Sequence, residues 1–135
     1  MLDIDKEIAE KVMGWHLRND WWVRDGNGDQ KYIITLPVRF VMQEDSKEST
    51  LEQDPWRPST NIEQAFMVMD RMRALDWQMQ LFSLRKPYKN FFCAFYYSWS
   101  LWKELKTKDY CNADTPAMAI CLAALKLAKS VELVP

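Results

Sequence analysis

Near the carboxyl end of the chain, one predicted helix is apolar on two sides. The segment Asp114–Lys129 reads DTPAMAICLAALKLAK and contains nine consecutive apolar residues, Ala117–Leu125. A surface helix normally keeps one polar face. One side of this helix carries Met118, Cys121, Leu122 and Leu125, and the other carries Ile120, Leu127 and small alanines. We therefore expect the second side to be covered by another part of the chain or by a second copy, with Ile120 and Leu127 as the candidate seam of a homodimer.

The length and charge of the chain restrict its class. A chain of 135 residues predicts a single domain, residues 1–135, that buries a core without disulfides. With 18 basic and 19 acidic side chains the net charge is -1. This balance argues against a duplex-DNA binder, which neutralises phosphates with lysine and arginine. No apolar run reaches the roughly 18 residues of a membrane span, and no signal peptide is recognisable, so we expect a soluble intracellular protein.

The residues that usually carry catalysis or bind metals are sparse. His16 is the only histidine, so no Ser-His-Asp or HExxH arrangement can be built. Cys93, Cys111 and Cys121 stand singly without metal-ligand spacing, and we expect free, buried thiols. Gly26 and Gly28 lack the context of a phosphate-binding loop and indicate a turn. The sequence therefore predicts no enzyme, no metal and no cofactor.

The first third of the chain predicts a helix followed by a hairpin. Asp3–Met13 has apolar residues at helical spacing and Gly14 in place to end the helix. Trp15–Arg24 is typical of a strand, and the Asp25–Gly28 segment supplies residues suited to a tight turn. The return strand, Lys31–Met42, is interrupted by Pro37, which favours an edge strand, a bulge or two shorter strands.

The middle of the chain predicts a long acidic loop, Gln43–Pro58, and then a helix. Thr60 and Glu63 match the T-x-x-E capping box at the start of this helix. We expect its buried stripe to consist of Ile62, Ala65, Phe66, Met69 and Met72.

Two strands and the apolar helix complete the pattern. Asp76–Leu84 alternates apolar and polar residues, whereas Phe91–Trp99 is apolar on both faces and belongs in the centre of a sheet. Leu101–Tyr110 is a lysine-bearing turn. In the last helix Asp114 or Thr115 can cap, and Pro116 suits the first turn. The order is about α-β-β-α-β-β-α, which predicts an α+β fold with a three-layer α/β/α sandwich on an antiparallel or mixed sheet.

Four segments in this order resemble the phage ABA sandwich domain family. They are IAEKVMGW (Ile8–Trp15), the Trp-rich stretch that follows with Asp25-Gly26, PSTNIEQAFMVM (Pro58–Met69) and ADTPAMAICLAALK (Ala113–Lys126). The resemblance implies an origin in phages or prophages, an α/β/α core and a place in the cytoplasm of the bacterial host, with no activity attached. Across Lys31–Trp56 and Lys86–Cys111 the chain is longer and more aromatic than the family pattern. We expect its own function there.

A protein-binding inhibitor is the first functional hypothesis. Small phage proteins of this kind are expected to act by occupying a host protein, such as a component of antiviral defence. An acidic loop can mimic nucleic acid against a basic groove, and a tryptophan can anchor it. The candidate residues are Glu44, Asp45, Glu48, Glu52, Asp54 and Trp56.

The alternative hypothesis is a small-molecule binder, a sponge for a nucleotide signal. Aromatic rings beside a cation provide a stacking face and a charge for such a ligand. Two sets have this composition: Trp21, Trp22 and Arg24, and Trp99, Trp102 and Lys103. The same aromatics could also stack the bases of single-stranded nucleic acid, which the net charge disfavours.

Overall fold

The chain forms two compact units, Met1–Gly14 with Arg57–Pro135, and Trp15–Trp56. The single domain expected for residues 1–135 stays a prediction. The computed structural model describes residues 2–18, 21–26, 30–36, 38–42, 49–53, 55–83, 90–97 and 109–131. Along 38–42 and 49–53 it describes the backbone alone.

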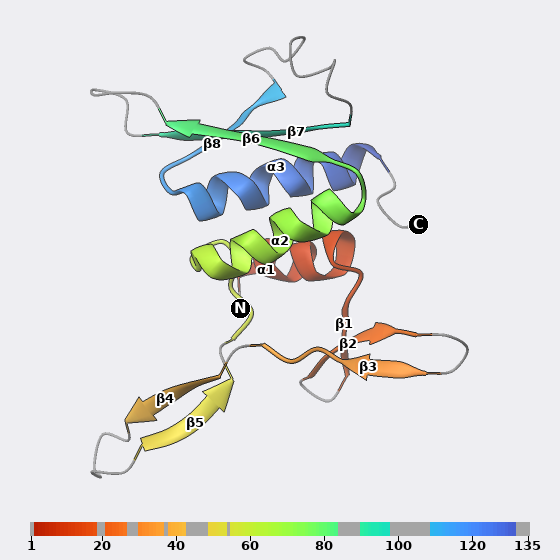
Figure 1. Cartoon of the computed structure of the whole chain (residues 1–135), viewed down its shortest axis with the longest axis vertical. Helices are drawn as coiled ribbons and strands as arrows, with labels where there is room; N and C mark the ends of the chain where they lie inside the picture. The colour runs from red at the N-terminus through yellow and green to blue at the C-terminus, as the bar shows by residue number, and fades with distance from the viewer. Residues whose placement is uncertain are drawn as a thin grey trace. The chain divides into compact units, whose positions relative to one another are not determined.

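The first unit contains the helices and one antiparallel sheet (Figure 1). Its elements are α1 (Asp3–Glu7), the π-helical η1 (Ile8–Val12), α2 (Ile62–Ala74), β6 (Gln78–Ser83), β7 (Phe91–Tyr96), β8 (Cys111–Ala113) and α3 (Pro116–Ser130). The second unit contains β1 (His16–Arg18), β2 (Trp21–Asp25), β3 (Lys31–Ile33), β4 (Val38–Met42) and β5 (Ser49–Gln53).

The amino-terminal helix is confirmed, as α1 continued by η1. It ends at Gly14, whose φ of +73° is a conformation that glycine adopts without the cost of a Cβ clash. The buried Asp5 accepts a hydrogen bond from the Ser59 backbone N–H at 2.9 Å. Arg71 Nε donates to the Val12 carbonyl at 3.2 Å. These two bonds tie the first helix to α2 and to the segment before it.

The start and the buried face of α2 differ from the prediction. Asn61, not Thr60, is the N-cap, and its side chain accepts a hydrogen bond from the Gln64 backbone N–H. The buried residues are Gln64, Ala65, Val68 and Met72. Ile62 and Phe66, predicted to be buried, are exposed. The Gln64 amide oxygen accepts a hydrogen bond from the Arg57 backbone N–H, which gives this buried polar side chain a partner.

The sheet of the first unit has the order β6-β7-β8, so β7 is its central strand as predicted. Residues Cys93 to Tyr96 are buried, and because neighbouring residues point to opposite faces, both faces of β7 are covered there. The short strand β8 was missed, because three residues between a turn and a helix cap carry no periodicity.

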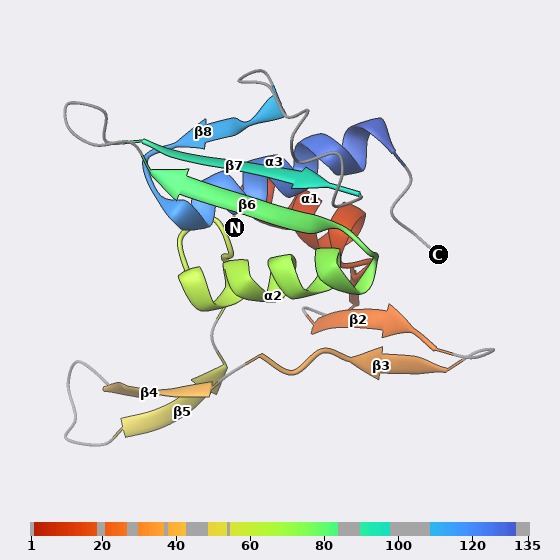
Figure 2. The ribbon, with the colours of Figure 1, turned by 45° about the horizontal axis from the view of Figure 1, so that its top comes forward.

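Helix α3 lies between the β6-β7-β8 sheet on one side and α1–η1 and α2 on the other (Figures 1 and 2). Its cap is Thr115, with Pro116 at the first turn, as predicted. Seven residues from Ala117 to Leu125 are buried. Ile120 is fully buried within the single chain and Leu127 is half-buried, so the chain itself covers the side on which Ile120 was a candidate dimer seam.

In the second unit, the predicted strand Trp15–Arg24 is two antiparallel strands, β1 and β2. The predicted hairpin is confirmed by the pairing of β2 with β3, in which Asp25 faces Lys31. The return strand splits into β3 and β4 around Pro37, one of the expected outcomes. The acidic loop is not irregular throughout, because β5 lies within it and pairs with β4.

The fold is α+β with antiparallel sheets, as predicted. Along the described part of the chain, no helix is long and apolar enough to cross a membrane.

Substitutions of Ile120 and Ile62 test whether α3 is buried by the rest of the chain. Replacing Ile120 with alanine leaves a cavity in the fully buried centre of the helix and should lower the free energy of unfolding by about 2–5 kcal/mol. Ile62→Ala, at an exposed position, should change it by less than about 0.5 kcal/mol. Urea denaturation measures both. Equal losses of unfolding free energy in the two variants would contradict the burial of Ile120 and the exposure of Ile62.

The N-cap of α2 can be tested in the same way. Asn61→Ala removes the acceptor of the Gln64 N–H and should cost about 1 kcal/mol of unfolding free energy. Thr60→Ala removes only a long hydrogen bond, 3.4 Å, to the Arg57 carbonyl, and should have a smaller effect. A larger loss of unfolding free energy from Thr60→Ala than from Asn61→Ala would show that Thr60 caps the helix, as the capping box predicts.

Candidate functional site

The β1-β2-β3 sheet carries different residues on its two faces. In an antiparallel sheet, residues directly opposite each other lie on one face, and successive residues alternate between the faces. Trp22 is opposite Leu17, and Arg24 is opposite Tyr32. Trp21, one residue before Trp22, lies on the other face. The predicted set Trp21, Trp22 and Arg24 is therefore split between the two faces of the sheet.

Three tryptophans form the core of the second unit. The centroid of the Trp15 ring lies 4.7 Å from the centroid of the Trp56 ring, in an edge-on arrangement. It lies 6.4 Å from the centroid of the Trp22 ring. Trp22 is 8% exposed and Trp56 is 4% exposed. Edge-on aromatic pairs add about 0.5–1.5 kcal/mol to the burial of their apolar area. Trp22 and Trp56, both candidate binding residues, are therefore buried in ring contact with Trp15.

On the same face as Trp22, Arg24 and Tyr32 form a cation–aromatic pair. The Arg24 guanidinium lies 4.6 Å from the centre of the Tyr32 ring. The ring passes so close to Gly26 that a Cβ there would clash with it. The Tyr32 hydroxyl donates to Gln30 Oε1 at 3.0 Å. These contacts hold the Tyr32 ring next to Arg24. The two side chains form a small exposed platform.

An ion pair closes the β2–β3 hairpin on the opposite face of the sheet from this platform. Lys31 donates a hydrogen bond to the Asp25 carboxylate. This hydrogen bond and the lysine charge hold the pKa of Asp25 below its usual value. Because both groups are exposed, the pair sets the register of the turn more than it stabilises the fold.

The opposite face presents a tryptophan to solvent. Trp21 is 51% exposed and stands directly opposite Arg18, and Ile33 on β3 is 63% exposed on the same face. Within the described residues, Arg18 makes no ion pair. We call Arg18, Trp21 and Ile33 the Trp21 surface. It combines a large aromatic ring, an aliphatic residue and an arginine, the composition of a protein-binding hot spot.

The remaining predicted site residues are not brought together by the described structure. Glu52 lies on β5, opposite Arg39 on β4. Outside the described residues lie Glu44, Asp45, Glu48, Asp54, Trp99, Trp102 and Lys103.

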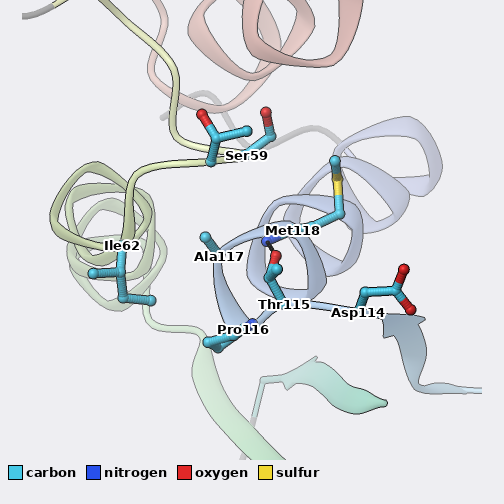
Figure 3. Close-up of a pocket in the computed structure, with 8 residues that line it drawn as sticks. Ser59, Ile62, Asp114, Thr115, Pro116, Ala117 and Met118 are labelled. Carbon is cyan, nitrogen blue, oxygen red and sulfur yellow. Dashed lines mark hydrogen bonds between the residues drawn. The ribbon is translucent and has the colours of Figure 1, made fainter. Parts of the chain in front are cut away.

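A separate hollow of about 440 Å³ lies in the first unit, between the starts of α2 and α3 (Figure 3). Its wall is mainly apolar and includes Ile62, Pro116, Ala117 and Met118. Thr115 Oγ1 accepts a hydrogen bond from the Met118 backbone N–H at 3.2 Å and so caps α3 at its edge. Sequence reasoning missed this hollow because it placed Ile62 in the core. Asp114 is the one ionisable side chain in its lining, which leaves no acid–base pair.

Metal ligands do not gather in the described residues, where no group of three histidine, cysteine or carboxylate side chains is suitably placed. His16 lies on β1 opposite Val23, at a distance in sequence from every cysteine.

Comparison with protein families defines the chain as a phage-associated α+β domain. The model of the phage ABA sandwich domain matches residues 6–125, which cover the second unit and most of the first. The chain belongs to this family, as its sequence motifs predicted. Comparisons with curated proteins and with solved structures give no match.

Truncation of the two adjacent tryptophans of β2 should affect the stability of the sheet to different degrees. Trp22→Ala opens the aromatic core and should accelerate amide hydrogen exchange in β1, β2 and β3 by about a hundredfold. Trp21→Ala removes an exposed ring and should leave exchange nearly unchanged. Exchange measured by mass spectrometry distinguishes them. If Trp21→Ala loosened the sheet as much as Trp22→Ala, Trp21 would belong to the core.

Proposed function

We propose that this phage-family protein acts without catalysis, in the cytoplasm of the bacterial host, as a stoichiometric inhibitor that binds a host protein through the Trp21 surface. The observation that carries the proposal is the exposure of Trp21 and Ile33 on a sheet whose other tryptophan is buried. Leaving so much apolar surface in water has a cost that contact with a partner removes.

The composition of the Trp21 surface supports a protein partner. Tryptophan and arginine are enriched at the energetic centres of interfaces, and their neighbours exclude water around them. Arg18 adds a positive charge beside the ring. A complementary host surface would present an apolar pocket with a carboxylate at its rim. A host component of antiviral defence is the kind of target that the phage origin favours.

The rigidity of the sheet supports binding at low entropic cost. Trp21 is one residue from the buried Trp22 and is paired with Arg18 of β1, in the central strand of the sheet. A ring held on a paired central strand loses little freedom when a partner docks. The acidic side chains of 44–54 are a second candidate contact in this proposal.

The alternative is a sponge for a nucleotide signal, and one observation favours it. Arg24 and Tyr32 form an exposed platform of cation and ring, which could stack a base and attract a phosphate. This platform and the Trp21 surface lie on opposite faces of the sheet. Variants at one need not disturb the other, so the two functions can be separated.

A pull-down from host lysate with the full chain tests the proposal. The wild type should retain one host protein, which binds the purified chain at a fixed ratio. Trp21→Ala should weaken this binding by about thirtyfold or more, the loss typical of a hot-spot residue. Phe66→Ala, an exposed aromatic on α2, is the matched control and should bind normally.

A ratio of absorbance at 260 and 280 nm on the purified chain addresses the alternative. A bound nucleotide that is released on denaturation and lost in Arg24→Ala, with no host protein retained, would replace the inhibitor with the sponge. Turnover of any substrate would overturn both functions.

A further inference from the structure

Three cysteines that are far apart in the sequence converge inside the first unit. Cys93 on β7 is directly opposite Cys111 on β8. Opposed residues share a face of an antiparallel sheet, so the two thiol side chains project from the same face. Helix α3, which packs on β7 and β8, carries Cys121. All three thiols are free.

The pairing register suits a disulfide between Cys93 and Cys111. Directly opposed residues of antiparallel strands have Cα atoms about 4.5–5.5 Å apart. Disulfides form across Cα separations of about 4.4–6.8 Å, so a bridge here needs little backbone movement. Cys121 belongs to a helix in the next layer and has no such register with Cys93.

Access to solvent distinguishes the two members of this pair. Cys111 is half-buried and lines a surface hollow of about 430 Å³ together with Asn112, Leu122, Leu125, Lys126 and Lys129. Cys93 is fully buried. A small reagent that enters the hollow therefore reaches Cys111 first.

The electrostatic environment also favours reaction at Cys111 before Cys93. Burial raises the pKa of Cys111, and the charge of Lys126 acts against this rise. Burial, and then the neighbouring Cys111, raise the pKa of Cys93 to about 12. The thiolate is the attacking species in disulfide exchange, so it forms more readily at Cys111 than at Cys93.

We propose that Cys111 and Cys93 form a thiol–disulfide exchange site that takes a low-molecular-weight disulfide, such as glutathione disulfide, and closes into a cross-strand bridge. The Cys111 thiolate attacks one sulfur of the reagent, which breaks its S–S bond and releases one thiol. Cys93 then attacks the Cys111 sulfur of the mixed disulfide and releases the second thiol. Both cysteines are oxidised, the reagent is reduced to two thiols, and the two cysteine protons go to those thiols.

The bridge would join the three-residue edge strand β8 covalently to the central strand β7. Strand β8 ends at Ala113, two residues before the Thr115 cap of α3. Closing the bridge would therefore stabilise the approach to the central helix of the unit. We expect the Tm of the chain to rise by about 5 °C or more.

The experiment treats the reduced full chain with glutathione disulfide and maps the products by peptide mass spectrometry. The wild type should give a Cys93–Cys111 bridge that dithiothreitol reverses. Cys93→Ser should stop at a glutathione adduct on Cys111, and Cys111→Ser should form neither product. Cys121→Ser is the matched control, because it removes the third thiol of the cluster and should still close the bridge.

Other products would overturn the proposal. A Cys93–Cys121 bridge would show that the helix, not the paired strand, supplies the partner. A wild-type chain that stops at a Cys111 adduct, or does not react, would show that Cys93 cannot resolve it. A closed bridge without a rise in Tm would remove the stabilising role.

Discussion

The burial of α3 from two sides is the constraint on which the first unit depends. A helix with two apolar faces is insoluble alone, and here the β6-β7-β8 sheet covers one face while α1–η1 and α2 cover the other. Because Ile120 and its alanine neighbours are fully or nearly fully buried, the other helices pack closely against this one. Hydrogen bonds of Asp5 and Arg71 add to the apolar contacts that hold these helices in place.

Features carried by local signals were predictable from the sequence. The Gly14 stop, the Thr115 cap, the β2–β3 hairpin and the central position of β7 each follow from a few neighbouring residues with a specific backbone role. Gly14, Thr115 and the turn of the hairpin lie within the family motifs, and for this reason the family could be recognised where the activity could not.

Features set by distant contacts could not be predicted. The face that α2 buries includes Gln64, which is bonded to the Arg57 backbone, whereas periodicity alone favoured Ile62 and Phe66. The tryptophans illustrate the same limit, because composition identifies an aromatic surplus without saying which rings meet. Cys93 and Cys111 are 18 positions apart in the sequence, and only the register of β7 and β8 makes them a pair.

The alternation of Trp21 and Trp22 on β2 links the core of the second unit to its surface. A shift of the strand by one residue would exchange the faces of the sheet on which the two rings lie. The stability of the unit and the identity of its exposed ring are thus set by the same register. Under the proposed function, residues around Trp21 can diverge to suit a new partner while Trp22 preserves the framework.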